Sequence, residues 1–152
     1  LTDEERKMLH RIFEFGDTQV SAVMVSKDKM VSLDINVGPD KLLEVLTEEG
    51  HSRIPVFEDT SEHIIGIIYA QDLLHIWRNK ALIVLRDLIH LPYFIEPGKK
   101  VNDLLREFQQ NKVQIAIVID KNKNAVGLVT LEDLIEEIVG EIEEKRDFNK
   151  KK

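Results

Sequence analysis

The sequence predicts a mixed α/β (α+β) fold in which two similar βαββα units pack as one module behind an N-terminal helix. Three observations support this prediction. The segment 66–73, GIIYAQDL, returns as 127–134, GLVTLEDL, an internal repeat with an offset of 61 residues (127 minus 66). Runs of β-branched residues between polar turns indicate buried strands. Apolar residues at helical spacing indicate helices with one side facing a core.

The first predicted element is a helix over residues 3–15. Its apolar residues share one helical face: Met8, Leu9, Ile12 and Phe13. Thr2 or Asp3 is the expected N-cap, and Gly16 is the expected end of the helix. Such a helix can cover the core or connect to a preceding domain.

The remaining elements follow the same order in both units. In the first unit we expect a strand at 30–33, a helix at 40–49, strands at 54–57 and 64–68, and a helix through Leu74 and Trp77. In the second unit we expect a strand at 93–95, a helix from 101 to about 110, strands at 115–119 and 125–129, and a helix from 131 to about 142. The division is a linker helix at 1–19, the first unit at 20–82, the second unit at 83–144 and a tail at 145–152.

Composition limits the possible functions. Units of about 60 residues are marginal alone, so we expect the two to share a core. The net charge of −7 argues against a nucleic-acid surface, which needs clustered Lys and Arg. No apolar run is long enough to cross a bilayer, so no membrane insertion by this chain is expected. Because the chain opens at Leu1, it is interpreted as a segment of a longer protein.

The repeated motif resembles tandem cystathionine-β-synthase (CBS) domains, and the resemblance covers almost the whole chain. Three segments are similar to the CorC/HlyC type of this family: HSRIPV at 51–56, IAIVID at 115–120 and GLVTLEDLIEEIVGEI at 127–142. That type includes magnesium and cobalt efflux proteins, relatives of the cyclin-M transporters and hemolysin-like proteins. Many of these proteins place a membrane domain before the CBS pair.

The resemblance implies a cytoplasmic regulatory module that binds an adenine nucleotide and controls a membrane transport domain of the same longer chain. We expect this module to form a homodimer, because small repeat pairs expose apolar helix faces that pairing can cover. The implied ligand is ATP or AMP, with Mg²⁺ carried on the nucleotide phosphates. Acidic residues crowd the last predicted helix, but Mg²⁺ prefers few carboxylates together with water and phosphate oxygens, so no metal site built by the protein itself is expected.

Thr130 and Asp133 form the leading candidate site. Thr130 lies where a strand becomes a helix, and free N–H groups at a helix start favour anions. In CBS pairs, a residue matching Thr130 often contacts phosphate and one matching Asp133 accepts hydrogen bonds from ribose. The same Thr-Leu-Glu-Asp run also fits a capping box, in which both side chains only satisfy backbone N–H groups. The sequence leaves both roles open.

Further candidates come from both units. Asp72 repeats Asp133, but Tyr69 replaces Thr130 and is a poor N-cap, which weakly favours a sugar contact over capping for the aspartate. Ile115, Ala116 and Ile117 are candidates for the wall around an adenine, or are ordinary core strand. Two cations, Arg53 and Lys27, are candidate phosphate contacts, with a surface ion pair and a solvated loop lysine as their respective alternatives.

Other functional classes have less support. The sequence has no H-E-x-x-H, Walker or G-x-G-x-x-G motif and no cysteine, so no enzyme activity is expected. The main alternative is a ligand-free dimerisation scaffold of a hemolysin-like membrane protein, with Asp72 and Asp133 serving only as helix-terminal anions. A lytic toxin is a third hypothesis, but no strongly basic amphipathic segment supports it.

Overall fold

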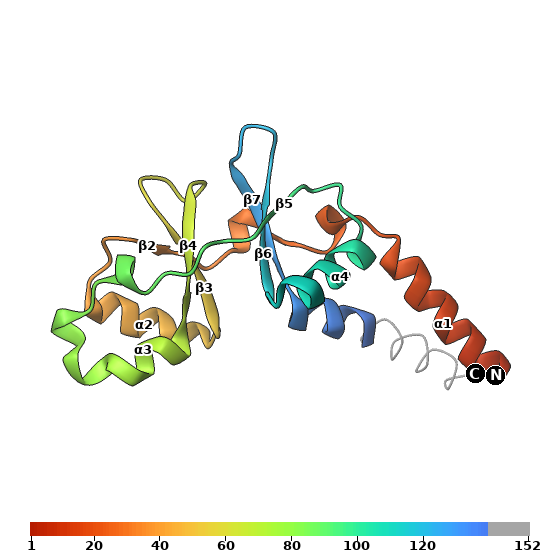
Figure 1. Cartoon of the computed structure of the whole chain (residues 1–152), viewed down its shortest axis with the longest axis horizontal. Coiled ribbons are helices and arrows are strands. Elements are labelled where there is room, and N and C mark those ends of the chain that lie inside the picture. The colour runs from red at the N-terminus through yellow and green to blue at the C-terminus, as the bar shows by residue number, and fades with distance from the viewer. Residues whose placement is uncertain (140–152) are drawn as a thin grey trace.

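The computed structural model describes residues 1–139, apart from the side chains of residues 80 and 81. It confirms a mixed α and β fold with two sheets and an N-terminal helix (Figure 1). The elements before and within the first unit are α1 (Asp3–Gly16), β1 (Val25–Ser26), β2 (Leu33–Asp34), α2 (Pro39–Glu49), β3 (Arg53–Phe57), β4 (Ile64–Tyr69) and α3 (Ala70–Ile76). Those of the second unit are β5 (Phe94–Ile95), α4 (Val101–Asn111), β6 (Ile115–Ile119), β7 (Ala125–Thr130) and a helix whose described part is residues 131–139.

The two sheets repeat one topology. β2 runs parallel to β3, which pairs antiparallel with β4, and β5, β6 and β7 follow the same scheme. Even the irregularity is repeated, because the antiparallel register shifts after Val56 in one sheet and after Val118 in the other, 62 residues apart (118 minus 56). The internal repeat therefore extends to backbone hydrogen bonding.

The strand β1 was not predicted. The sequence division counts it with the first unit, yet it pairs antiparallel with β7 of the second unit, Val25 opposite Leu128. Its counterpart is His90 in the connecting segment, which forms an isolated antiparallel bridge with Ile67 of β4. The repeated glycines make these crossings possible: a Cβ on Gly127 would lie 2.6 Å from Met24 Sδ, and one on Gly66 would lie 2.6 Å from Ile89 Cβ.

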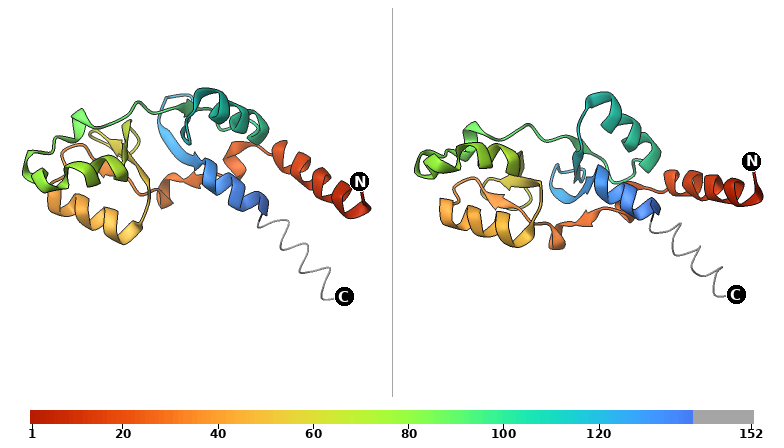
Figure 2. Two further views of the ribbon diagram at one scale, coloured as in Figure 1. Left: turned by 60° about the horizontal axis from the view of Figure 1, so that its bottom comes forward. Right: turned by 90° about the horizontal axis from the view of Figure 1, so that it is seen from below.

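The core has three parts. One apolar cluster lies around Leu42 and Leu73 in the first unit, and a second lies around Leu104 and Leu134 in the second unit. The third is shared, because Ile64 and Ile67 of β4 pack with Ile115 and Ile117 of β6. Each sheet therefore has helices packed on one side and turns its other side toward its partner sheet, while α1 extends away from the body (Figure 2). A shared core was expected for units this small.

The remaining differences are local. Thr2 is the N-cap of α1, its Oγ1 accepting a hydrogen bond from Glu5 N at 3.2 Å. The strand predicted at 30–33 begins only at Leu33, because Met30 and Val31 line a cavity instead of pairing with β3. The predicted end of the last helix near 142 and the tail at 145–152 lie outside the described residues. Within residues 1–139, no helix has the length and apolar character needed to cross a membrane.

Candidate functional site

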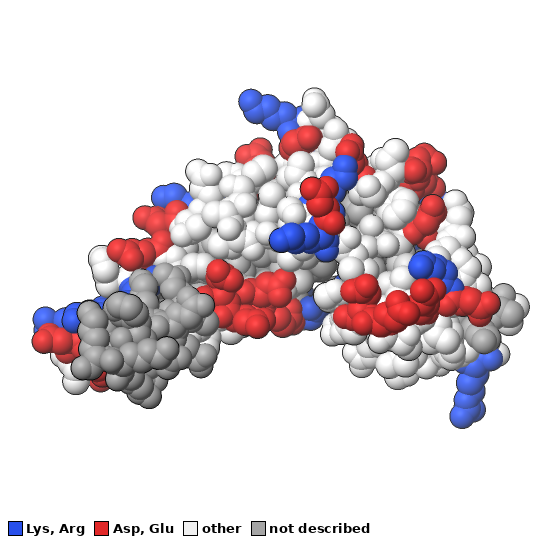
Figure 3. Space-filling model, turned by 180° about the vertical axis from the view of Figure 1, so that it is seen from behind, with Lys and Arg blue, Asp and Glu red and all other residues white. Residues whose placement is uncertain are grey.

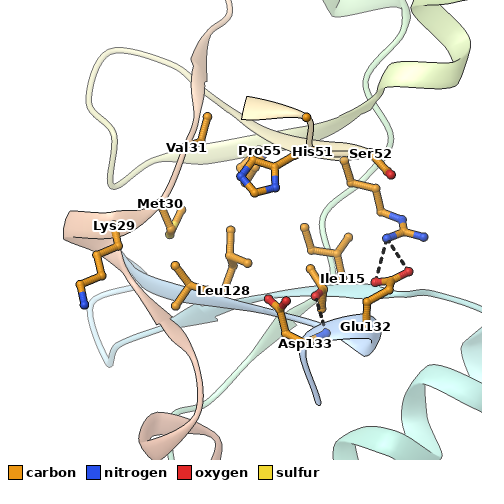
Figure 4. A pocket seen from close by; sticks show the side chains of 14 residues that line it. Lys29, Met30, Val31, His51, Ser52, Pro55, Ile115, Leu128, Glu132 and Asp133 are labelled. Atoms are coloured by element: carbon orange, nitrogen blue, oxygen red, sulfur yellow. Dashed lines mark hydrogen bonds and ion pairs between the residues drawn. The ribbon is translucent and has the colours of Figure 1, made fainter. Parts of the chain in front are cut away.

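A cavity of about 270 Å³ lies between the two units (Figure 4). The second unit contributes the start of β6, the end of β7 and the first turn of the last helix, and the first unit contributes the segment before β2 and the start of β3. The lining residues are Val25, Lys29, Met30, Val31, Gly50, His51, Ser52, Arg53, Pro55, Ile115, Leu128, Thr130, Glu132 and Asp133. Four of the residues predicted from the sequence are therefore brought together: Thr130, Asp133, Ile115 and Arg53.

Thr130 and Asp133 form one corner of this cavity. Strand β7 ends at Thr130, and Asp133 N donates a hydrogen bond to Thr130 Oγ1 at 3.1 Å. Thr130 is therefore an N-cap in this structure, which is one of the two roles left open above. A hydroxyl that accepts a hydrogen bond still has its own O–H to donate, so capping and ligand contact are compatible.

Arg53 lies at the same cavity and joins the two units. Its Nη1 donates to both carboxylate oxygens of Glu132, at 3.1 Å each, and its Nη2 donates to the side-chain oxygen of Gln114. The Arg53 side chain is 17% exposed, whereas that of Glu132 is 59% exposed. Arg53 is thus a partly buried cation facing the cavity, held by a carboxylate that reaches it from the solvent side.

The walls of the cavity are largely apolar. Met30, Pro55, Ile115 and Leu128 surround its interior in Figure 4. Of the three predicted wall residues in β6, only Ile115 lies at the cavity, while Ala116 and Ile117 are fully buried in the core. Ile117 N also donates to Tyr93 O at 2.8 Å, so this backbone group is used within the sheet.

The structure places the other two predicted residues elsewhere. Lys27 pairs with Glu62 in the loop between β3 and β4, and the tight turn Lys27–Lys29 brings Lys29 rather than Lys27 to the cavity. Asp72 Oδ2 lies 2.9 Å from His90 Nε2, and the His90 ring stacks on Tyr69 with centroids 4.2 Å apart. Asp72 is therefore already engaged within the chain.

Sequence reasoning missed Lys29, Met30, His51 and Glu132. Met30 was assigned to a strand, because a three-residue turn before it leaves no periodic signal. Glu132 is one of the acidic residues that crowd the last predicted helix, and nothing local in the sequence indicates its contact with Arg53, 79 residues away (132 minus 53). His51 lies within the HSRIPV segment, beside the predicted Arg53.

The acidic residues do not assemble a metal centre within the described part of the chain. Figure 3 shows Asp and Glu side chains gathered along one edge of both halves of the molecule. Within residues 1–139, no group of three or more His, Asp or Glu side chains has the arrangement needed to hold a metal ion.

Three side chains outside the cavity, those of Tyr93, Lys99 and Glu107, form a polar cluster in which the pKa of each group is shifted. Tyr93 Oη donates to Glu107 Oε1 at 2.9 Å, and Lys99 Nζ lies 2.7 Å from Glu107 Oε2. The Lys99 hydrogen bond lowers the pKa of Glu107, and the same bond raises the pKa of Lys99. Burial, followed by the hydrogen bond to Glu107, raises the pKa of Tyr93. All three groups belong to the second unit.

A family model for the CBS domain matches residues 20–79 and 84–140 of this chain. The chain is 35% identical over 150 residues to the magnesium and cobalt efflux protein CorC of Vibrio cholerae, covering 98% of this chain and 52% of that protein. It therefore spans about half of the length of the curated relatives it matches.

Two solved structures with similar folds contain nucleotides. The CBS domain of a bacterial CNNM/CorC family Mg²⁺ transporter in complex with ATP is 38% identical, with a TM-score of 0.81, covering 90% of this chain and 97% of that one. A CBS-domain pair from Klebsiella pneumoniae with bound AMP is 30% identical, with a TM-score of 0.69, covering 80% of this chain and 98% of that one.

Proposed function

The chain belongs to the CBS-domain family and is a CBS pair of the CNNM/CorC type, and on this premise we propose that it binds an adenine nucleotide in the cavity between its two units. The observation that supports this most strongly is the convergence of Thr130, Asp133 and Arg53 on one apolar cavity. A pair of hydrogen-bonding side chains suits a ribose, a cation suits a phosphate, and apolar walls suit a purine.

The size of the cavity suits the nucleoside part of the ligand. Small-molecule pockets typically enclose about 300–1,000 Å³, and the cavity of about 270 Å³ lies just below that range. Base and ribose would occupy the interior against Ile115, Leu128 and Met30, with Asp133 accepting from the ribose hydroxyls. The phosphates would extend toward Arg53, whereas Lys29 lies at the opposite end of the cavity (Figure 4).

Mg²⁺ would enter with the nucleotide. No cluster of His, Asp or Glu in residues 1–139 is arranged to bind a metal, and Mg²⁺ keeps water and phosphate oxygens among its ligands. Phosphate oxygens of a bound ATP, together with water, would therefore be the ligands of this Mg²⁺.

We propose that occupancy of this site regulates a membrane transport domain of the magnesium and cobalt efflux type, attached to the module on the cytoplasmic side. The relatives that this chain matches are about twice its length, which leaves room for such a domain. Apolar side chains on the outer faces of α3 and the last helix, Leu74 at 76%, Ile135 at 51% and Val139 at 46% exposed, would be covered in a homodimer.

Calorimetric titration with ATP, ADP and AMP, each with and without Mg²⁺, tests the binding proposal. We expect saturable binding by the parent chain and its loss in Asp133→Ala, with circular dichroism establishing that the variant is folded. The matched control is Asp72→Ala, which removes the repeated aspartate from the other corner. Equal affinity of Asp133→Ala and the parent would refute the site.

The scaffold alternative keeps some support from the same exposed apolar faces, because dimerisation alone would explain them. Sedimentation establishes whether the chain is a dimer, and the calorimetric titration establishes whether that dimer binds a nucleotide. A dimer that binds none of the nucleotides under any of these conditions would favour the scaffold.

A further inference from the structure

We infer that the carboxylate of Glu132 occupies the anion position of Arg53 in the nucleotide-free protein, and that a nucleotide phosphate must displace it to bind. Glu132 is then a positioning residue that sets nucleotide affinity and links ligand binding to the contact between the two units. This inference rests on the proposed function, because it concerns the same cavity.

The first argument is the geometry of the pair. Both oxygens of Glu132 lie 3.1 Å from one atom, Nη1 of Arg53, while Nη2 is taken by Gln114. A guanidinium recognises a carboxylate and a phosphate by the same donors, because both ligands present oxygens in a plane that matches its N–H groups. A phosphate that approaches Nη1 therefore competes with Glu132 for the same donor.

The second argument is position. Arg53 and Glu132 line the cavity together with Thr130 and Asp133, so the ion pair lies within the proposed binding site. Figure 4 shows the Glu132 carboxylate beside Asp133 at the start of the last helix, turned toward the guanidinium. A phosphate bound to Arg53 would be repelled by the negative charge of Glu132 unless that side chain moved away.

The third argument is the balance of exposure. Glu132 is 59% exposed and Arg53 is 17% exposed, so Glu132 can swing into water at little cost while the cation stays at the cavity. An ion pair whose carboxylate is largely in solvent contributes little net free energy. A phosphate carries more charge and more acceptor oxygens than a carboxylate, so the exchange is favourable but reduces the affinity that Arg53 alone would give.

The exchange has a consequence for the arrangement of the units. Arg53 is the first residue of β3 in the first unit, and Glu132 lies in the first turn of the last helix in the second unit. Displacing Glu132 removes this ion pair between them and replaces it with contacts through the ligand. Binding energy is thereby coupled to how the last helix is held against β3, and a ligand shifts an arrangement only through such differential contacts.

The test is Glu132→Gln, which keeps the shape of the side chain and removes its charge. We expect its Kd for ATP to fall about 3- to 10-fold relative to the parent in calorimetric titration. Glu136→Gln is the matched control, because it makes the same charge change one turn further along the same helix, and the ion pair described for Arg53 is with Glu132 rather than Glu136. Its Kd should change less than 2-fold, as expected for a screened exposed charge.

A double-mutant cycle separates positioning from general electrostatics. In an Arg53→Gln background, Glu132→Gln should no longer tighten ATP binding, because the competition requires the guanidinium. The inference is overturned if Glu132→Gln matches Glu136→Gln, or if its effect persists without Arg53. Failure of the parent chain to bind any nucleotide would instead overturn the proposed function, so the two failures are distinguishable. Thermal unfolding of each variant establishes that binding is measured on folded protein.

Discussion

The two strand-to-helix corners of this molecule share a backbone but differ in what their side chains contact. In the second unit, Thr130 and Asp133 face a cavity. In the first unit, the matching Tyr69 and Asp72 both contact His90, whose ring stacks on that of Tyr69 and whose Nε2 lies 2.9 Å from the Asp72 carboxylate, a side chain that remains 41% exposed. Repetition thus preserved the backbone of the corner, while tyrosine at position 69 and the imidazole of His90 engage the side chains of the first corner within the chain.

A second contrast concerns three matching positions of the two units. Tyr93, Lys99 and Glu107 form a hydrogen-bonded cluster in the second unit. The residues 62 positions earlier are all valines, Val31, Val37 and Val45, packed against the first unit's core. The same place in the fold therefore tolerates either an ion pair with a phenol or three apolar side chains, which indicates that the pair is not required for the topology.

The largest expected effect tests the difference between the corners. Asp133→Ala should weaken nucleotide binding by roughly 1.5–3 kcal/mol, about 10- to 100-fold, because it removes the acceptor proposed for the ribose. Asp72→Ala should leave the affinity unchanged, and the parent should bind one nucleotide per chain. Calorimetry gives both the affinity and the stoichiometry. Two equivalent sites, or equal losses in the two variants, would show that the corners do not differ in function.

The next effect concerns the polar cluster. Glu107→Val should lower the free energy of unfolding by about 1–2 kcal/mol, because it leaves the Lys99 ammonium partly buried without its counter-ion. Changing all three residues to valine, as in the first unit, should restore most of the loss, since apolar replacements of an ion pair are often neutral. Urea unfolding measures both. A triple variant less stable than Glu107→Val would contradict the equivalence of the two clusters.

The cluster should also make the stability of the second unit depend on pH, whereas the valines of the first unit carry no titratable group. The pKa of Glu107 is lowered in the folded chain, so its contribution is present above the ordinary carboxyl value of 4.5 and is lost as pH falls through the lower folded pKa. The pKa values of Tyr93 and Lys99 are raised, so their contributions are present below 10.0 and 10.5 and are lost as pH rises through the folded values. The stability difference between the parent and the triple valine variant, followed by urea unfolding from acid to alkaline pH, should therefore favour the parent most between these limits. A difference independent of pH would show that these groups do not stabilise the fold through their charges.

The smallest effect compares two helix ends. The C-cap residue after α2 is Gly50 with φ of 64°, and the one after α4 is the matching Lys112 with φ of 54°, both in the left-handed region. Lys112→Gly should stabilise the chain by a few tenths to about 1 kcal/mol, and Gly50→Ala should destabilise it by about 1 kcal/mol. No atom lies within 4 Å of a Cβ built on Gly50, so the cost there would be conformational alone. Thermal unfolding resolves shifts of this size, and the opposite signs distinguish the two ends.

The sequence was sufficient for the elements with strong periodicity or repetition. It predicted both βαββα units, Thr2 as one of two candidate caps of the first helix, and Thr130 with Asp133 at one corner. It did not predict β1, because a two-residue strand has no periodic pattern and its partner lies in the other unit. The contact of Glu132 with Arg53 and the contact of Asp72 with His90 depend on how distant segments meet. For the same reason Lys29, and not Lys27, reaches the cavity.

The crossing of β1 to the second sheet has a consequence for how the chain folds during synthesis. Val25 pairs with Leu128, so β1 cannot pair until the chain 103 residues further on has been synthesised (128 minus 25). Contacts of such sequence separation slow folding, because the loop between them has to close before they form. On the ribosome, the segment around Val25 would stay without its sheet until β7 emerges. The module is therefore expected to reach its native state late, as one cooperative unit, and splitting the gene between the repeats should yield halves that fold only when expressed together.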